Sequence, residues 1–317
     1  MAQALARLGQ AETDLPDRSE HTLAFLRSHG HVPILPYDRS VDEPARYLVY
    51  SITKTYLGVL CLRLGLDLEA PIATWIDDAR LPDASLRQLL NHTSGVPDYG
   101  RLPDYHAAVR ERPSEPWEDE ELLARALAQG PDFPPGEGWA YSNTGYLLVR
   151  RIVELASEGG FRGALERELL HPLALADTSL ALELADLHDL APGPGDVDDV
   201  RGRYHPCWVG HRTLASTVAD QTRFWTALAA GELCDLDVLT QSVEIGFEAP
   251  GFHRPSYGLG VMTDRRPDGL LVGHGGGGPG YAAAAFALLR PEGEPRVVVL
   301  LSADERADVQ REALSRL

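Results

Sequence analysis

The stretch Ser51-Ile52-Thr53-Lys54 lies where a short extended segment, residues 47–50, gives way to an apolar run, residues 55–64. The extended segment predicts a strand, and the apolar run predicts a buried helix. Residues three apart on the first turn of a helix share a face, so this spacing puts Ser51 beside Lys54. A serine becomes a nucleophile when a neighbouring base accepts its proton, and a desolvated lysine can be that base. The alternative is a serine that caps the helix beside a solvent-exposed lysine.

A single lysine stands among the 29 basic residues of the 317-residue chain, and that lysine is Lys54. An arginine guanidinium stays protonated in proteins, so a step that needs a neutral amine is open to lysine and closed to arginine. The composition therefore marks Lys54 as a candidate catalytic base. The alternative is a coding bias toward arginine that left one lysine by chance.

The chain is acidic, with 47 Asp and Glu residues against 29 Lys and Arg residues and a formal net charge of −18. Such a surface repels phosphate backbones and anionic membranes, so we expect neither a nucleic acid nor a membrane as partner. No stretch approaches the ~20 consecutive apolar residues of a membrane span, and the N-terminus becomes charged too early for a secretory leader. We therefore expect a cytoplasmic protein.

Metal and disulfide chemistry is not indicated. The three cysteines, Cys61, Cys207 and Cys234, are widely spaced and indicate buried thiols rather than a disulfide framework or a zinc site. The segment His29-Gly30-His31 is more typical of a hairpin turn than of a metal site. We expect no metal and no cofactor.

Tyr141 and Asn143 alternate along residues 133–146, so on an extended segment both side chains face one side. They offer a phenol for proton transfer and an amide for hydrogen bonds. A tyrosinate near an ammonium group can take a serine proton and later return one to the leaving group. The alternative is a core tyrosine whose hydroxyl is satisfied by the asparagine.

Six of the eight residues 273–280 are glycine, which marks the segment as glycine-rich. Glycine permits close backbone approach, so the N–H of Gly276 or Gly277 can join that of Ser51 in an oxyanion hole. A flexible loop is the alternative. The segment lacks the Gly-Lys pair of a phosphate-binding loop.

Four segments together resemble, in order and spacing, the serine β-lactamase and penicillin-binding-protein superfamily, in particular its class C-like branch of esterases and D-amino peptidases. They are Ser51-Ile52-Thr53-Lys54, residues 86–99 (LRQLLNHTSGVPDY), residues 133–146 (FPPGEGWAYSNTGY) and residues 273–281 (GHGGGGPGY). The resemblance covers roughly residues 45–303. It implies the following roles: Ser51 as nucleophile, Lys54 and Tyr141 as proton carriers, and Asn143, His274, Gly276 and Gly277 as groups that contact substrate or oxyanion, with Gly277 preferred for the oxyanion.

One departure from the family pattern bears on the substrate. His274 and Gly275 stand where many β-lactamases and transpeptidases of the superfamily have lysine and threonine. A histidine is mostly neutral near neutral pH and glycine has no side-chain donor, so tight binding of a substrate carboxylate is not expected. Histidine here resembles the esterase and D-aminopeptidase relatives, which favours esters or amides as substrates.

The pattern of elements predicts an α+β, β-lactamase-like fold: an antiparallel sheet flanked by terminal helices, with an inserted, mostly α-helical lobe. We expect one catalytic domain, residues 1–317, with an α/β lobe from about 1–51 and 251–317 and a helical lobe of about 52–250. The expected strands are 257–263, 269–272, 281–289 and 296–301, and the expected closing helix is 303–317. The active site is expected in the cleft between the lobes.

The predicted function is that of a serine hydrolase that acts through an acyl-enzyme on a small ester, amide or lactam, most like an esterase. A β-lactamase or a D-Ala or D-amino-acid peptidase is the alternative within that chemistry. The alternative from another class is a penicillin-recognising binding or sensor module that does not turn over. The oligomeric state is not predicted.

Overall fold

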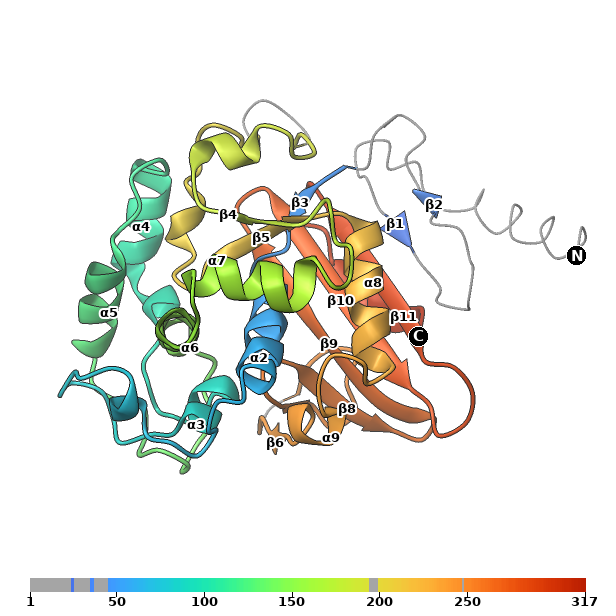
Figure 1. Cartoon of the computed structure of the whole chain (residues 1–317). Coiled ribbons are helices and arrows are strands. Elements are labelled where there is room, and N and C mark those ends of the chain that lie inside the picture. The colour runs from blue at the N-terminus through green and yellow to red at the C-terminus, as the bar shows by residue number, and fades with distance from the viewer. Residues whose placement is uncertain (1–23, 26–34, 37–44, 194–198, 247) are drawn as a thin grey trace, which may run out of the picture.

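The computed structural model describes residues 24–25, 35–36, 45–193, 199–246 and 248–317, and Figure 1 shows its elements. The predicted turn at His29-Gly30-His31 lies outside the described residues. The main sheet has six strands, all antiparallel, in the order β11-β10-β9-β8-β7-β6. In chain order these strands are β6 (Val243–Glu244), β7 (Ser256–Tyr257), β8 (Met262–Arg266), β9 (Gly269–Gly278), β10 (Tyr281–Leu289) and β11 (Arg296–Ser302).

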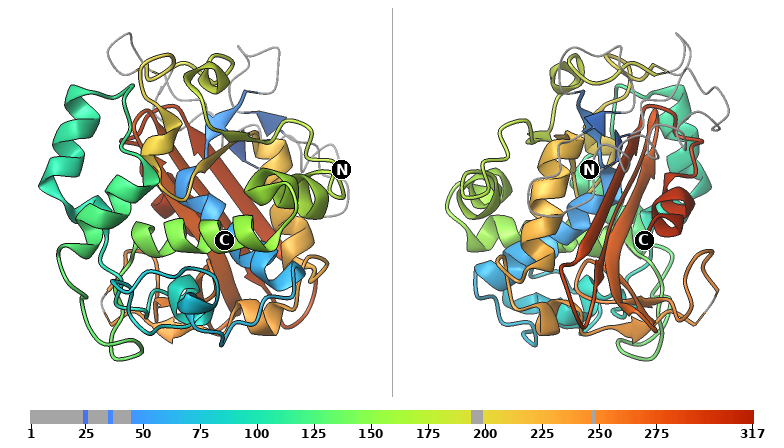
Figure 2. Two further views of the ribbon diagram at one scale, coloured as in Figure 1. Left: turned by 60° about the vertical axis from the view of Figure 1, so that its left-hand side comes forward. Right: turned by 90° about the vertical axis from the view of Figure 1, so that its right-hand side faces the viewer.

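Helices cover both faces of this sheet, as the edge-on view in Figure 2 shows, with α10 on one face and α2 and α8 on the other. Side chains of a strand alternate between faces, and β10 follows that rule. Ala283 and Ala285 belong to the large core on the side of α2 and α8, whereas Ala284 and Phe286 pack in a smaller core with α10. The layers confirm the predicted α+β class.

Most helices of the described residues, α2 to α9, lie within the stretch of about 52–250 that the sequence predicts to be helical. They are α2 (Thr53–Arg63), α3 (Leu86–Leu90), α4 (Pro103–Glu111), α5 (Asp119–Leu127), α6 (Asn143–Ala156), α7 (Gly160–Leu165), α8 (Val218–Ala229), α9 (Leu236–Leu239) and α10 (Val309–Ser315). Short 3-10 turns occur at Tyr50–Ile52, Ile72–Thr74, Tyr99–Arg101, Leu184–Leu187 and Pro206–Trp208, and a π turn at Glu166–Leu170.

The middle of the chain also holds a second sheet that the sequence analysis did not predict. Its strands lie in the order β3-β5-β4 and are β3 (Tyr47–Leu48), β4 (Ser179–Ala181) and β5 (Thr213–Ser216). β3 leads directly into the 3-10 turn Tyr50–Ile52, which holds Ser51. The sheet therefore ties the start of the nucleophile turn to a segment more than 160 residues later. At the N-terminus, β1 (Ala24–Phe25) and β2 (Leu35–Pro36) pair with each other and not within the six-stranded sheet.

The glycine-rich segment is strand and not loop, because β9 continues through it to Gly278. A Cβ added at Gly276 would lie 2.1 Å from the carbonyl oxygen of Val49, and one at Gly278 would lie 2.5 Å from the ring of Tyr50. Real Cβ atoms do not approach that closely. Glycine at these two positions therefore lets β9 lie directly against the turn that carries Ser51.

Helix α2 is buried on all sides along most of its length, which explains its nearly unbroken apolar sequence. A Cβ at Gly58 would lie 2.1 Å from the carbonyl oxygen of Leu259, so the helix packs directly on that backbone. The hydroxyl of Thr55 donates to the carbonyl of Gly260 at 2.7 Å. These contacts fix the helix that carries Lys54 against the segment entering β8.

Candidate active site

Ser51 and Lys54, which are three residues apart, meet Tyr141, which lies 90 residues beyond Ser51, beside the end of β9. Lys54 Nζ lies 3.0 Å from Ser51 Oγ, and the Tyr141 hydroxyl donates to the same oxygen at 2.9 Å. Tyr50, which precedes the serine, has a φ of 45°, a left-handed conformation that is strained for a tyrosine. Its N–H donates to Thr213 Oγ1 at 2.9 Å and its hydroxyl to the Pro279 carbonyl at 2.5 Å, so this conformation is held from both sides.

The charge state of Lys54 is set by burial. Its side chain has no exposed surface, and desolvation holds the pKa of the amine well below its usual range, although Asp98 acts in the opposite direction. A lower pKa favours the free amine, which is the form that can accept a proton. Such an amine can accept the proton of the Ser51 hydroxyl at the distance observed.

Tyr141 is a phenol rather than a tyrosinate. Burial raises its pKa above the ordinary value, against the smaller effect of the hydrogen bond with Ser51. The ring is held by His92, whose centroid lies 4.4 Å away, and His92 Nδ1 accepts the N–H of Ser142 at 3.2 Å. The raised pKa and the hydrogen bond that Tyr141 donates to Ser51 Oγ favour the protonated phenol over the tyrosinate that the sequence analysis considered.

Asn143 lies beside Lys54 and its amide orientation is fixed by Asp98. Its Nδ2 donates to Asp98 Oδ2 at 3.2 Å, its backbone N–H donates to Asp98 Oδ1 at 2.9 Å, and its Oδ1 accepts from Lys54 Nζ at 2.9 Å. A carboxylate only accepts hydrogen bonds, so the amide nitrogen must face Asp98 and the amide oxygen must face the lysine. Asp98 was part of a motif that the sequence analysis quoted, but its contact with Asn143 was not predicted.

A cleft of about 670 Å³ opens in front of Ser51. Tyr141, Asn143 and Gly277 line it, and a Cβ at Gly277 would meet no atom within 4 Å. Gly277 thus borders open space, whereas Gly276 lies against Val49. The rest of the wall is largely aromatic or apolar and includes Tyr50, Tyr99, Tyr105, Val109, Tyr204, Val209 and Pro279.

His274 differs from its expected role, because it is buried and does not line the cleft. Its Nδ1 lies 2.5 Å from the carbonyl of Gly275, so that nitrogen carries the proton, and its Nε2 accepts from the Tyr257 hydroxyl at 2.8 Å. Burial, and secondarily Lys54, lower its pKa to about 3. His274 is therefore a neutral internal residue with both nitrogens bonded, and it has no donor left for a substrate carboxylate.

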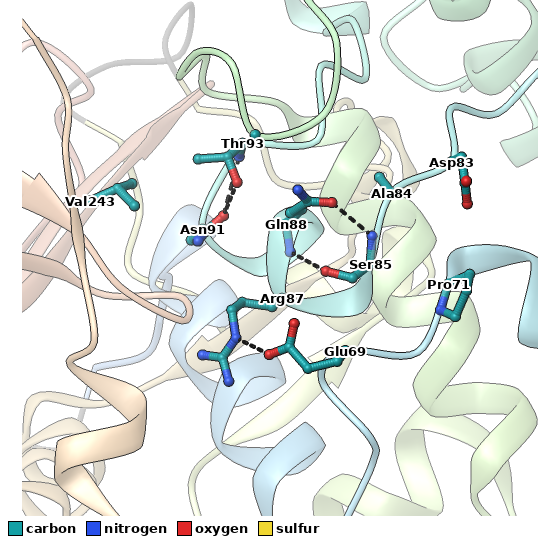
Figure 3. Close-up of a pocket in the computed structure, with 11 residues that line it drawn as sticks. Glu69, Pro71, Asp83, Ala84, Ser85, Arg87, Gln88, Asn91, Thr93 and Val243 are labelled. Atoms are coloured by element: carbon teal, nitrogen blue, oxygen red, sulfur yellow. Dashed lines mark hydrogen bonds and ion pairs between the residues drawn. The ribbon is translucent and has the colours of Figure 1, made fainter.

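A second hollow, of about 500 Å³, lies around the start of α3 (Figure 3). In Figure 3, Ser85 faces Gln88, Arg87 faces Glu69 and Asn91 faces Thr93. Ser85 and Gln88 form a reciprocal cap at the helix start, and Arg87 forms an ion pair with Glu69. Ser85 is thus engaged as a cap and has no base beside it in this hollow. The arrangement supports the helix and offers no nucleophile.

His211 is a site residue that the sequence analysis missed. Its ring nitrogens lie 3.2 Å (Nε2) and 3.5 Å (Nδ1) from Lys54 Nζ, and it lines the cleft. Nothing in its local sequence, a lone histidine between Gly210 and Arg212, distinguishes it from a loop residue. Only the fold brings it to the lysine.

Burial of Lys54 should make stability depend on pH. In the unfolded chain the Lys54 amine keeps its proton up to about pH 10, whereas in the folded chain its pKa is lowered. At pH values between these two pKa values, the unfolded state therefore binds one more proton than the folded state. The free energy of unfolding therefore rises with pH, by up to about 1.4 kcal/mol per unit. In Lys54→Met this contribution is absent. We expect the variant's stability advantage over wild type to shrink from acidic to alkaline pH, as measured by urea unfolding at several pH values; a constant difference would contradict the lowered pKa.

Within the described part of the chain, no group of three or more His, Cys, Asp and Glu side chains is arranged to hold a metal ion. Its cysteines are unpaired thiols, and burial raises the pKa of Cys61 to about 12. Over the same residues, no helix combines the length and the apolar character needed to cross a membrane.

Comparison with known proteins identifies relatives of this chain. Penicillin-binding protein 4* of Bacillus subtilis (strain 168) is 26% identical over 257 residues, which are 72% of this chain and 54% of that protein. A D-aminopeptidase of Cereibacter sphaeroides is 23% identical over 256 residues, which are 78% of this chain and 49% of that protein. The chain thus spans about half the length of these relatives.

Solved structures and a family model agree with these relatives. A D-stereospecific amidohydrolase from Streptomyces sp. superposes with a TM-score of 0.78 at 24% identity, covering 93% of this chain and 92% of that one. A D-amino acid amidase from Ochrobactrum anthropi SV3, complexed with L-phenylalanine, gives a TM-score of 0.76 at 21% identity over 98% and 96% of the two chains. These likenesses establish the fold. A family model described as Beta-lactamase matches residues 22–317, nearly the whole sequence, and the chain therefore belongs to the beta-lactamase family of serine hydrolases.

Proposed function

We propose that this protein hydrolyses esters and amides through an acyl-enzyme on Ser51. The neutral amine of Lys54 takes the hydroxyl proton as Ser51 Oγ attacks the substrate carbonyl carbon. The carbonyl oxygen becomes an oxyanion between the N–H groups of Ser51 and Gly277. Tyr141 gives its proton to the leaving group as the C–N or C–O bond breaks, and the Lys54 ammonium restores the phenol. Water then gives a proton to Lys54 as it attacks the acyl ester, and the Lys54 ammonium returns that proton to Ser51 Oγ as the ester bond breaks and the acid leaves.

The observation that carries this proposal is the hydrogen-bonded chain Tyr141–Ser51–Lys54 at the cleft. A structural lysine would be paired with a carboxylate or would reach solvent, because burying an unpaired ammonium is costly. Lys54 has no exposed surface, and its partners within hydrogen-bond distance in the described structure are a serine, an asparagine and a histidine. Such surroundings suit a free amine.

For the substrate we favour an acyl group with a free amine, such as a D-amino-acid amide or ester, over a penicillin. The carboxylate of Glu305 lines the cleft, its Oε2 fixed by the N–H of Gly280 at 2.8 Å, and the chain's charge of −18 favours cationic substrates. His274 is unable to bind a substrate carboxylate. Of the two arginines at the cleft, Arg306 is paired with Asp304 and Arg110 is exposed, where a charge pair is weak.

Two relatives support the same class of substrate, because a D-aminopeptidase and a D-amino acid amidase, as their names say, act on substrates whose acyl group carries an amine. Ester hydrolysis, which the sequence analysis placed first, stays within the proposal because the same steps cleave an activated ester. The ester therefore serves as the general probe and the D-amino-acid amide as the specific one.

The test is a panel of p-nitrophenyl acetate, D- and L-alanine p-nitroanilide and a chromogenic cephalosporin, run with wild type and Ser51→Ala. We expect wild type to cleave the ester and to prefer the D-anilide over its L enantiomer, with the cephalosporin slowest. Intact mass after treatment with a fluorophosphonate should show one adduct on wild type and none on Ser51→Ala.

Each alternative has its own outcome in this experiment. Turnover of the cephalosporin alone would overturn the substrate class and indicate a β-lactamase. A persistent cephalosporin adduct in the intact mass, without turnover, would indicate a penicillin-recognising binding or sensor module. Wild-type rates in Ser51→Ala would overturn the acyl-enzyme itself.

A further inference from the structure

The polar groups around Lys54 Nζ match, in number and kind, the hydrogen bonds that a neutral amine can form. A neutral amine has two N–H groups and one lone pair, whereas an ammonium has three N–H groups and no lone pair. The Asn143 oxygen, held toward the lysine by Asp98, takes one N–H. The lone pair must face the Ser51 hydroxyl if Lys54 is to act as a base, since the Tyr141 hydroxyl already donates to that oxygen.

One N–H of Lys54 then remains, and it needs an acceptor because the group is buried. Among the described residues, the remaining polar atoms within hydrogen-bond distance of Nζ are the two ring nitrogens of His211, at 3.2 and 3.5 Å. A neutral imidazole always has one unprotonated nitrogen that can accept. No other hydrogen bond of the His211 ring competes with this one in the described structure.

The segment that carries His211 is hydrogen-bonded to the turn that holds Ser51 and to the residue before it. Thr213 Oγ1 accepts the N–H of Tyr50 at 2.9 Å, and the Leu214 carbonyl accepts the N–H of Val49 at 3.0 Å. On the other side, the Gly210 N–H donates to the Tyr99 hydroxyl at 2.8 Å, and its carbonyl accepts from Arg150 Nε at 3.0 Å. The ring is thus carried by a segment whose position is set relative to the serine.

Burial, reinforced by nearby positive charges, favours the neutral form of the His211 ring. Burial lowers its pKa well below the ordinary value, and the positive charges near it act in the same direction. A protonated ring would have no acceptor and would repel any charge on Lys54. The titratable and charged groups that face this pair from the surrounding elements are Asp98, Tyr141, Tyr146, Arg150, Arg212, His92 and His274.

We propose that His211 is a positioning residue that accepts one N–H of the neutral Lys54 amine and thereby turns its lone pair toward Ser51. This inference rests on the proposed function, in which Lys54 is the base. In this proposal the loop before β5, which carries His211, helps to activate Ser51, a residue 160 positions earlier in the sequence. It also explains why the cleft wall at this point is a buried histidine rather than an apolar side chain.

The decisive variants are His211→Phe, which keeps an aromatic ring without an acceptor, and His211→Gln, whose side-chain oxygen can replace it. His171→Phe, at an exposed histidine outside the cleft, is the matched control. With p-nitrophenyl acetate we expect His211→Phe to lose about 10²-fold in kcat with KM little changed, as a misplaced catalytic group would. His211→Gln should recover most of that loss.

Lys54 can also be observed without any substrate, because it is the one lysine in the sequence. Protein made with ¹³C-labelled lysine gives a single side-chain ¹³Cε signal, and its pH titration reports the pKa of Lys54. An acceptor stabilises the ammonium more than the amine, so we expect this pKa to fall by about one unit in His211→Phe and to return in His211→Gln. A merely structural role would lower the melting temperature and leave the titration in place.

The inference is overturned if His211→Phe keeps the wild-type kcat and Lys54 titration, or if His211→Gln is as impaired as His211→Phe. Failure of the proposed function looks different. In that case wild type itself shows neither ester turnover nor a Ser51 adduct, whereas the lysine signal still reports whether His211 contacts the amine.

Discussion

Replacing Lys54 with methionine is expected to lower kcat/KM for p-nitrophenyl acetate by about 10⁴-fold, the upper end of what one acid–base group contributes. Methionine is a flexible apolar side chain of similar length, so it can fill the buried space of Lys54 without a charge. The Ser51 hydroxyl would keep its hydrogen bond from Tyr141 but lose its proton acceptor. The measurement is steady-state kinetics at several pH values, with circular dichroism as the check on folding.

Two further variants separate base catalysis from simple charge. Lys54→Arg keeps a positive charge that does not deprotonate, so it should be as inactive as the methionine variant. The double variant Ser51→Ala/Lys54→Met should be no worse than either single one, because nucleophile and base act as a unit. An active Lys54→Arg would show that charge alone suffices. A methionine variant within tenfold of wild type would place the base elsewhere.

The sheet could be predicted well where a continuous apolar run marks a buried strand, whereas the strand predicted over 257–263 is divided into β7, which ends at Tyr257, and β8, which begins at Met262. β10 was predicted as 281–289 and is observed with the same bounds, and β11 extends one residue beyond the predicted 296–301. The end of β9 could not be predicted, because a run of glycines has no side chains to alternate. Its extended form comes from pairing with β10 and from close contact with the turn that holds Ser51.

Local hydrogen bonds explain another difference. The closing helix was predicted over 303–317 but begins at Val309. Asp304 Oδ1 accepts the N–H of Arg306, and Asp308 accepts the N–H of Arg311 as the helix cap. Aspartate side chains that bond nearby backbone groups favour turns and helix starts over helix interiors, so the segment before Asp308 forms a turn.

In the candidate site, too, some residues could be predicted from the local sequence, whereas others are brought together only by the fold. Ser51 and Lys54 follow from a spacing of three residues, and their contact is local. Tyr141 and Asn143 follow from a motif, but the amide orientation depends on Asp98, which the fold brings near. His211 has no local signal, and the burial of His274 behind Tyr257 depends on packing that no pattern in the sequence records.

Replacing Tyr141 with phenylalanine is expected to affect amides far more than activated esters. An amine leaves only when it receives a proton, and the Tyr141 phenol, 2.9 Å from Ser51 Oγ, is the donor placed to supply it. A p-nitrophenolate leaves without one. We therefore expect kcat/KM for D-alanine p-nitroanilide to fall by about 10³-fold and that for p-nitrophenyl acetate by about tenfold, the latter from the lost hydrogen bond to Ser51.

The ratio of the two losses is the informative quantity, because a general disturbance of the cleft would lower both rates alike. Tyr105→Phe provides the matched control, since this tyrosine also lines the cleft but donates its hydroxyl to the Trp208 carbonyl at 3.0 Å, away from the serine. It should lower both rates by a similar, smaller factor. Equal losses of ester and amide activity in Tyr141→Phe would mean that the phenol orients Ser51 without protonating the leaving group, and that the Lys54 ammonium delivers the proton itself.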